Sequence, residues 1–369
     1  MPIKNVLFVA LAAALWLFLR QIGKRELISP KWLRRSVSVA GKTAALGLLV
    51  WAVVFVNLSP VASTGPYAVA SQVIQLDDPS RTETFSQAGG PRKLAVLMVF
   101  PEAPQLPGRT LPLVLFSHGG ISSMQGNLSL FEGLASHGYV VASVSHSFHA
   151  LSTPIDGRNR IISRGYFADI TRENSHKDIG NSLRLFDQWM ALRIADLSFV
   201  LDQLLAPGGD APWRQMIDAG SIGLGGHSLG GAAAYGLARK RQDVRAVMAL
   251  ESPYLADITG ISGGDFTWDT APYHCAMLNL YSDTGMRLVD KDHKYAQNKR
   301  LQAPGMGAES LHLSGSNHFT LTDLALTSPI LCTLLDGSHE TPGIETLRQI
   351  NQAALSFYNA HLKGPGRSN

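Results

Sequence analysis

The amino-acid sequence predicts an α/β fold with a doubly wound, mainly parallel sheet, preceded by an N-terminal hairpin of two hydrophobic, transmembrane-type segments. Apolar runs of about four to eight residues alternate with helical patterns along most of the chain. Runs that are apolar throughout are typical of strands covered on both faces, as in parallel sheets. The chain has 369 residues, 45% of them hydrophobic and 16% charged. This is enough for one large domain, and it argues against a disordered or coiled-coil protein.

The expected elements follow one another in a regular order. Strands are expected at 93–100, 113–116, 139–144, 222–225, 245–250, 275–281 and 310–313. Helices are expected at 129–137, 189–205, 229–239 and 344–362. Because strands and helices alternate in this way, a ligand is expected at the carboxyl ends of the strands.

Two stretches are expected to lack regular structure. Residues 67–93 are polar, with the breakers Asp-Asp-Pro at 77–79 and Gly-Gly-Pro at 89–91. Residues 145–188 show no convincing period. We expect this second stretch to form a lid-like insertion over the ligand site.

Residues 1–62 are expected to be a membrane anchor for the body of the protein, residues 63–369. Two segments, at about 5–19 and 43–60, contain almost no polar side chain. Each comes close to the roughly 20 apolar residues with which a helix spans a bilayer. The alternatives are a cleaved signal sequence, a single signal anchor, and two core helices of a soluble domain.

Positive charge is concentrated in the N-terminal region. The whole chain has a net charge of +4 and a pI of about 9.0, but residues 1–42 hold eight Lys or Arg and one Glu, which leaves the remainder at −3. A mildly acidic body excludes a nucleic-acid partner. Seven of the basic residues lie at 20–42, and the positive-inside rule places this loop in the cytoplasm. The body is therefore expected on the periplasmic side of the inner membrane, or secreted if the leader is cleaved.

The cysteines and histidines give no sign of a metal or a cofactor, and we expect neither. Cys275 and Cys332 leave open whether they form a disulfide, because the sequence gives no distance between them. The twelve histidines show no metal-binding spacing, and we interpret His146 and His149 as a loop pair.

The most informative stretch is a glycine-rich turn with a serine at its centre. Gly226-His227-Ser228-Leu229-Gly230 fits G-x-S-x-G between an expected strand and an expected helix. In that context the serine lies on a strained turn, and the two glycines remove side chains that would collide there. The motif predicts Ser228 as a nucleophile; the alternative is a glycine-rich turn with an inert serine.

A serine nucleophile needs a histidine that takes its proton. In this arrangement the histidine is expected late, in the loop before the terminal helix, and His318 lies there. His312 falls within an expected strand, and His339 comes later still. We therefore predict His318 as the general base and then acid.

An oxyanion hole requires two backbone N–H groups. One is expected from Leu229, the residue after the nucleophile. The other is expected from Ser-His-Gly-Gly at 117–120, where Gly120 is the first choice and Gly119 the second.

The acid that orients the histidine stays open between two carboxylates. Glu251 follows the expected strand at 245–250, and Asp283 follows the one at 275–281. Either position suits a catalytic triad. The carboxylate that is not used is expected to cap a turn or to accept another hydrogen bond.

Five stretches of the body carry a resemblance to a known family. They are Gly-Pro-Tyr at 65–67, LPLVLFSHGG at 111–120, LASHGYVVASVSH at 134–146, GHSLGG at 226–231 and GSNHFTLTDLAL at 315–326. Over about residues 65–330 the body resembles the platelet-activating-factor acetylhydrolases of plasma type (isoform II) and their bacterial relatives, which implies the α/β-hydrolase fold. In that family the acid is an Asp in an Ala-Leu-Asp context. Here Ala249-Leu250-Glu251 stands at that place, so the resemblance favours Glu251 and keeps Asp283 in contention.

The resemblance implies a metal-independent serine hydrolase for carboxylic esters, of short-chain acyl or phospholipid type, working through an acyl-enzyme. Its partners would be a small-molecule or lipid ester and the membrane. Phe148, Tyr166 and Phe167 of the insertion are candidates for an acyl pocket, or for packing on the body. A cutinase-like polyester hydrolase or a lipase is the alternative activity. A non-catalytic, membrane-tethered binding module of the same fold is the alternative from another class.

Overall fold

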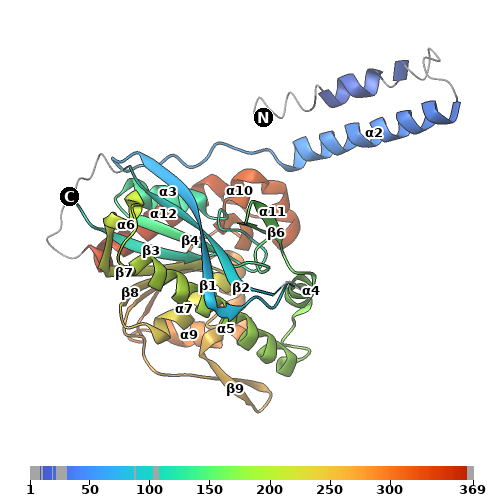
Figure 1. Cartoon of the computed structure of the whole chain (residues 1–369). Coiled ribbons are helices and arrows are strands. Elements are labelled where there is room, and N and C mark those ends of the chain that lie inside the picture. The colour runs from blue at the N-terminus through green and yellow to red at the C-terminus, as the bar shows by residue number, and fades with distance from the viewer. Residues whose placement is uncertain are drawn as a thin grey trace.

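The computed structural model describes residues 9, 11–18, 20–21, 31–86, 89–102 and 108–363. Eight of the described strands pair into one central sheet (Figure 1). They are β1 (Val69–Thr82), β2 (Pro91–Pro101), β3 (Leu111–Ser117), β4 (Val140–Ser145), β7 (Ile217–His227), β8 (Val244–Leu250), β11 (Ala276–Tyr281) and β12 (Ala308–His312). Two small antiparallel pairs lie outside it: β5 (Ser152–Ile155) with β6 (Arg158–Ile161), and β9 (Ile258–Ser262) with β10 (Asp265–Trp268).

The sheet is mostly parallel, as the sequence predicts. Its order is β1-β2-β4-β3-β7-β8-β11-β12, and β2 alone runs in the direction opposite to the other seven strands. The register aligns the ends of the central strands, since Ser117 pairs with Gly226 and His227 with Leu250. The loops that follow β3, β7 and β8 therefore emerge together at one edge of the sheet.

Helices cover both faces of the sheet (Figure 1). On one face lie α5 (Ile179–Leu205) and α7 (Leu229–Lys240), and on the other lie α3 (Leu128–Ser136) and α12 (Gly343–Leu362). Along β2, Leu94 and Val96 pack on the α5–α7 side, whereas Ala95 and Leu97 pack on the α3–α12 side. Both faces are buried, which explains why the strand is apolar throughout. The α-helices are α2 (Lys31–Val54), α3 (Leu128–Ser136), α4 (Arg164–Arg172), α5 (Ile179–Leu205), α6 (Pro212–Met216), α7 (Leu229–Lys240), α8 (Asp283–Lys291), α9 (Ala296–Leu301), α10 (Leu324–Thr327), α11 (Pro329–Asp336) and α12 (Gly343–Leu362). Short 3₁₀ helices are η2 (Leu255–Asp257), η3 (His293–Tyr295) and η4 (His318–Leu321).

All seven expected strands and the four expected helices are present, but the expectation for residues 67–93 is wrong. Most of this stretch forms β1, an edge strand whose side chains are largely exposed. An edge strand carries little apolar signal, because one of its sides faces solvent. Pro79 is tolerated because the pairing with β2 shifts register between Asp78 and Thr82.

The insertion at 145–188 is also more regular than expected. It contains β5, β6 and α4, and α5 begins at Ile179 rather than at 189. Asp178 caps this helix, since its side chain accepts a hydrogen bond from the Asn181 N–H at 2.9 Å. The polar residues of the first turns hide the helical period that is clear from Trp189 onward.

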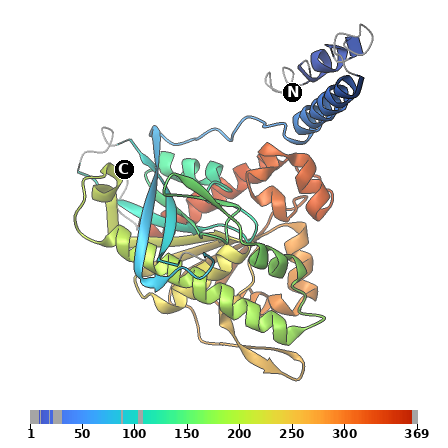
Figure 2. The ribbon, with the colours of Figure 1, turned by 45° about the vertical axis from the view of Figure 1, so that its right-hand side comes forward.

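One helix among the described residues is long and apolar enough to cross a membrane, and it is α2, which projects from the body (Figures 1 and 2). Its 24 residues span about 36 Å at roughly 1.5 Å per residue. The expected boundaries, 43–60, are wrong: α2 begins inside the predicted basic loop at 20–42 and ends at Val54. No proline interrupts Lys31–Val54, and its two glycines, Gly41 and Gly47, do not end the helix, which continues through its basic residues.

The first hydrophobic segment is helical wherever it is described, at residue 9 and at 11–18, and it lies beside α2 (Figure 1). Lys42 Nζ lies 5.7 Å from the centre of the Trp16 ring. Ala12 and Ala45 are buried, as expected for small residues between two packed helices. Parts of the predicted segment (5–8, 10 and 19) and of the basic loop (22–30) lie outside the described residues.

The two cysteines are free thiols in the structure. Cys332 is buried in α11, and Cys275 lies just before β11, partly exposed. Their pairing was left open by the sequence, and the structure shows both unpaired.

Candidate active site

Ser228 occupies a sharp turn between β7 and α7. Its backbone has φ 52° and ψ −126°, a conformation that costs free energy for any residue with a side chain. A Cβ at position 226 would lie 2.4 Å from the carbonyl carbon of Gly230, and a Cβ at position 230 would lie 2.0 Å from the Ser117 oxygen. The Ser228 N–H donates to the Leu250 carbonyl at 2.8 Å, which ties the turn to β8. The two motif glycines, Gly226 and Gly230, are therefore required by space at this turn.

His318 and Glu251 form a hydrogen-bonded pair at the same edge of the sheet. Nδ1 of His318 lies 2.7 Å from Oε1 of Glu251, the carboxylate is fully buried, and the imidazole is partly exposed. Glu251 directly follows β8 and has φ 48°. His318 begins η4, which Asn317 caps. The pair has the geometry of a base and the acid that orients it.

The ring of His227 connects this pair to the serine turn. The ring centres of His227 and His318 are 4.5 Å apart, and Nε2 of His227 lies 3.3 Å from the His318 carbonyl oxygen. Because His227 directly precedes Ser228, His318 lies beside the turn. No hydrogen bond joins the Ser228 hydroxyl to His318 in the structure, and in free hydrolases this contact often tightens only when substrate binds.

The second carboxylate oxygen of Glu251 is held by Ser282. It accepts from the Ser282 N–H at 3.0 Å and from the Ser282 hydroxyl. A Cβ at Gly285 would lie 2.5 Å from the same oxygen. A glycine there leaves room for the glutamate side chain.

Asp283 lies apart from this pair. Its carboxylate lies 2.7 Å from Nε2 of His312 and accepts from the Gly315 N–H at 3.0 Å. Both Asp283 and His312 are exposed. Of the two candidate acids, the structure brings Glu251 to His318 and places Asp283 at another histidine.

Charge interactions bind the pair together. Burial acts to raise the pKa of Glu251, but the neighbouring His318 and the hydrogen bonds from Ser282 lower that pKa below its ordinary value. Burial acts to lower the pKa of His318, but Glu251 and then Asp336 raise it above its ordinary value. The Asp336 carboxylate also accepts a hydrogen bond from the backbone N–H of His318 at 2.7 Å. His318 therefore takes up a proton more readily than a free histidine does.

A buried arginine of α5 fixes the loop after β3, which contains the predicted oxyanion residues Gly120 and Gly119. Arg193 of α5 donates to the carbonyl oxygen of His118 at 2.6 Å and of Gly119 at 3.3 Å. Tyr166 of α4 donates to the Gly120 oxygen at 3.0 Å. In a trans peptide the N–H points opposite to the C=O. Because Arg193 binds the Gly119 carbonyl, the Gly120 N–H is turned away from Arg193.

Leu229, the other predicted oxyanion donor, begins α7 and is buried. The start of α7 packs on the loop after β3, as the short distances from position 230 to the Ser117 and His118 carbonyls show. The two predicted sources of N–H groups are thus neighbours in space.

A buried network of charged groups supports the same loop. Nε2 of His146 lies 2.9 Å from the Ser117 hydroxyl, and its Nδ1 lies 2.9 Å from Asp196. Asp196 accepts in turn from Arg92 at 2.7 Å and from Arg81 at 2.8 Å. Burial lowers the pKa of His146 to about 4, which keeps the ring neutral near pH 7. His146 and His149 both lie in the loop after β4, as expected, and His146 in addition connects β3 to α5.

The three aromatic side chains proposed for an acyl pocket lie in different surroundings. Tyr166 is buried, and its ring stacks on His149 with centres 3.7 Å apart. Phe148 stacks on Phe85 at 5.9 Å, and Phe167 is exposed. Tyr166 alone among the three has a described hydrogen bond to the predicted oxyanion loop.

Three residues that build the site were not found from the sequence: Arg193, Ser282 and Asp336. No motif contains them, because they act through contacts between distant parts of the chain. Arg193 did carry a signal: it lies four residues after Trp189 and four before Leu197, on the apolar face of α5. A charged residue on such a face is rare unless it is paired.

Comparison with known proteins connects part of the chain to a family and most of it to a fold. Residues 96–156 match the family model of platelet-activating factor acetylhydrolase, isoform II. This segment runs from β2 to the β5–β6 turn and contains the stretches at 111–120 and 134–146, so the resemblance is confirmed there. No curated protein sequence matches the chain.

Among solved structures, a ferulic acid esterase from Streptomyces cinnamoneus matches with a TM-score of 0.59 and 22% sequence identity. The match covers 85% of this chain and 97% of the esterase chain. The chain therefore shares its fold with that structure, and its mostly parallel eight-stranded sheet is consistent with an α/β-hydrolase fold.

Proposed function

We propose that the chain is a serine hydrolase that cleaves carboxylic esters through an acyl-enzyme. Ser228 is the nucleophile, His318 the general base and Glu251 the acid. The observation that carries the proposal is the 2.7 Å hydrogen bond between His318 and the buried Glu251, beside the strained Ser228 turn. A loose histidine near a glycine-rich turn would not need a buried carboxylate, whose desolvation costs free energy.

The reaction follows from these positions. Ser228 Oγ attacks the ester carbonyl carbon while His318 takes its proton, and the N–H groups of Leu229 and Gly120 stabilise the oxyanion. His318 then gives the proton to the leaving alcohol, which leaves an acyl group on Ser228. A water molecule deprotonated by His318 attacks this ester, the bond from the acyl carbon to Ser228 Oγ breaks, and His318 gives its proton to Oγ as the carboxylic acid departs. The residues present carry every step without a metal ion.

The substrate class is proposed from the comparisons. The matched family model is that of an acetylhydrolase, and the structural neighbour is an esterase. Both names describe hydrolysis of an ester bond, which supports short-chain acyl esters or phospholipid-type esters for this chain.

Hydrolysis of p-nitrophenyl acetate, butyrate and longer esters by the full chain tests this function. Ser228→Ala and His318→Ala should each lower kcat/KM by roughly 10⁴-fold or more. Ser71→Ala, at an exposed serine of β1, and His312→Ala, at a histidine with its own carboxylate partner, are matched controls that should keep the activity. A folded parent that hydrolyses none of these esters, or a Ser228→Ala variant as active as the parent, would favour the non-catalytic binding module.

We propose further that the hydrolase is anchored in a membrane by its N-terminal hairpin. α2 keeps its apolar side chains exposed, as a helix in lipid would. Where α2 ends, the Ser328 hydroxyl donates to the Val54 carbonyl at 2.5 Å. α11 follows Ser328 directly and exposes Leu334 and Leu335. An apolar patch beside the end of an apolar helix supports contact of this side of the body with lipid.

A further inference from the structure

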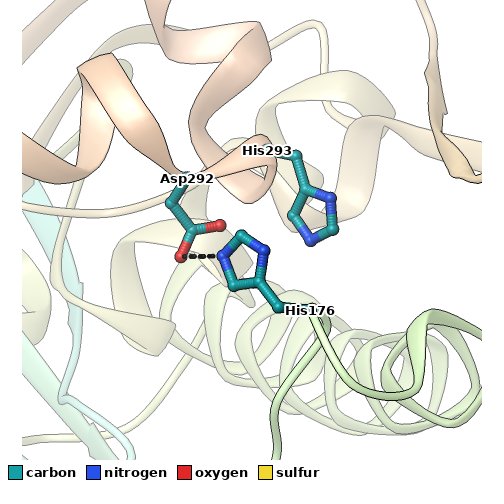
Figure 3. Close-up of side chains that lie close together, drawn as sticks. All are labelled: His176, Asp292 and His293. Atoms are coloured by element: carbon teal, nitrogen blue, oxygen red, sulfur yellow. Dashed lines mark ion pairs between the residues drawn. The ribbon is translucent and has the colours of Figure 1, made fainter.

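A second group of chemically competent side chains lies outside the proposed active site. His176, Asp292 and His293 each offer a ligand atom, and the three atoms lie within 4.8 Å of one another (Figure 3). The two imidazole rings stack with centres 4.6 Å apart and 5° between their planes. Nε2 of His176 lies 3.8 Å from Oδ2 of Asp292. Two imidazoles and one carboxylate form a ligand set that zinc commonly takes, with a fourth position left for water.

The three ligands come from two segments that are distant in the sequence. His176 lies in the connection between α4 and α5, whereas Asp292 and His293 follow α8 at the start of η3 (Figure 3). Oδ1 of Asp292 caps η3 by accepting from the Lys294 N–H at 2.9 Å, so this carboxylate is held in place. The side chains of Asp292 and His293 are largely buried, and that of His176 is exposed. Two ligands of the site, Asp292 and His293, are thus held in place, whereas the third, His176, belongs to the insertion.

Both ring nitrogens of His293 have a polar neighbour. Its Nε2 lies 2.8 Å from the Ser175 hydroxyl, and its Nδ1 lies 3.4 Å from Oδ1 of Asp265. A metal at Nε2 would take the place of the Ser175 contact, and the Asp265 carboxylate near Nδ1 would then fix the ring and raise its strength as a ligand. Asp265 stands on β10, so a third segment supports the group.

The local charge favours a cation. The ion pairs described around the group contain three carboxylates, those of Asp292, Asp265 and Glu173, and one ammonium group, that of Lys294. Lys294 Nζ is closer to Glu173, at 3.2 Å, than to Asp292, at 3.8 Å. Lys294 is therefore shared between Glu173 and Asp292.

We propose that His176, Asp292 and His293 bind a divalent transition metal, zinc by preference, and that the metal fixes the α4–α5 connection to the start of η3. Calcium is disfavoured because it requires six to eight oxygen ligands. The metal has a structural role in this proposal. By fixing the connection after α4 it would help to hold α4, whose Tyr166 donates a hydrogen bond to the Gly120 carbonyl. The inference does not depend on the proposed esterase activity.

Metal titration of the full chain, stripped with a chelator and kept in detergent, tests the site. Zinc should bind with a stoichiometry near one by calorimetry, and cobalt should give the visible absorption of a four-coordinate site. His176→Ala, His293→Ala and Asp292→Asn should each weaken zinc binding by at least about tenfold. His312→Ala removes a histidine that has a carboxylate neighbour but no second histidine, and it should bind zinc like the parent. Absence of zinc binding by the parent, or equal binding by His176→Ala and the parent, would overturn the proposal.

Limited trypsin digestion tests the proposed role in fixing the insertion. Arg172 and Lys177 flank the metal ligand His176 and are cleavage points for trypsin. Zinc should slow cleavage at both positions in the parent and leave the rate unchanged in His176→Ala, whose exposed side chain is not needed for folding. Calcium at the same concentration should protect neither protein. Zinc protection that persists in His176→Ala would place the metal elsewhere.

Discussion

Glu251 is one methylene longer than the aspartate found at this place in the family that the chain resembles, and a single neighbour makes room for it. Any side chain at Gly285 would meet Oε2 of Glu251, and the same oxygen accepts two hydrogen bonds from Ser282. The longer acid therefore reaches His318 with its other oxygen free to bind. The type of residue at position 251 and the absence of a side chain at 285 belong together.

Glu251→Gln should change the pH profile of the enzyme as well as its rate. Glu251 raises the pKa of His318, so its removal should shift the acid limb of kcat/KM to lower pH, because His318 acts as a base only when it is unprotonated. kcat should fall by roughly 10⁴-fold, because the imidazolium loses its charged partner. pH–rate profiles on p-nitrophenyl butyrate measure both effects.

Asp283→Asn is the matched control for this prediction. Asp283 pairs with the exposed His312 at the same distance of 2.7 Å, so its loss should leave both the profile and kcat nearly unchanged. The opposite result, a large loss in Asp283→Asn and a small one in Glu251→Gln, would exchange the roles of the two carboxylates.

Gly230→Ala should destabilise the protein and reduce its activity. The added Cβ would lie 2.0 Å from the Ser117 oxygen, a backbone atom that cannot move without shifting β3. Overpacking of this kind costs about 1–3 kcal/mol. Gly165→Ala, in the first turn of α4, is the control, because a Cβ there would lie 3.7 Å from the Ser163 hydroxyl oxygen, an ordinary contact distance. Urea unfolding of the two variants should show a loss for Gly230→Ala and no loss for Gly165→Ala.

At the scale of elements, α5 connects the core of the protein to the predicted oxyanion loop. Arg193 reaches from this helix to the carbonyl groups of His118 and Gly119. Arg193 is fully buried, so we expect it to position the loop rather than to contact a substrate. α5 therefore contributes to the proposed reaction through the orientation of two peptide groups.

Arg193→Met should lower kcat with little change in KM. Loss of the guanidinium leaves buried carbonyl groups without a donor, which costs about 1–3 kcal/mol of unfolding free energy. Misplaced N–H groups weaken binding of the transition state more than binding of the ester. Arg184→Met, on the exposed face of the same helix, should change neither kcat nor KM. A rise in KM alone in Arg193→Met would assign this residue to substrate binding.

The element scale also explains what the sequence could and could not predict. The inner strands were recognisable because both of their faces are buried, and the order Ser228, Glu251, His318 follows from where strands end. β1 was missed because an edge strand is half exposed, and α2 was misplaced because its basic turns look like a loop. Asp336 and Ser282 could not be found, because each is defined by one contact with a distant residue.

At the scale of the whole molecule, we expect the basic loop of the hairpin on the cytoplasmic side of the membrane and the body on the other side. A reporter enzyme that is active only outside the cytoplasm, fused after Asn369, should be active if the body is exported. The same reporter fused after Arg25, in the basic segment, should be inactive because that segment stays in the cytoplasm. The full chain should remain with the membrane after an alkaline wash. A shorter, soluble product would identify a cleaved leader, and an inactive fusion at the C-terminus would reverse the topology.

Backbone hydrogen bonds hold the residues that follow α2 directly against the body. Asn57 and Leu58 donate backbone hydrogen bonds to Thr327 and Leu326, only a few residues after His318. If α2 spans a bilayer, these hydrogen bonds hold the proposed catalytic edge at a fixed position relative to the helix. The enzyme would then act within a thin layer above the lipid and meet its substrates by lateral diffusion. Esters free in the surrounding volume would reach it less often than those that share its surface.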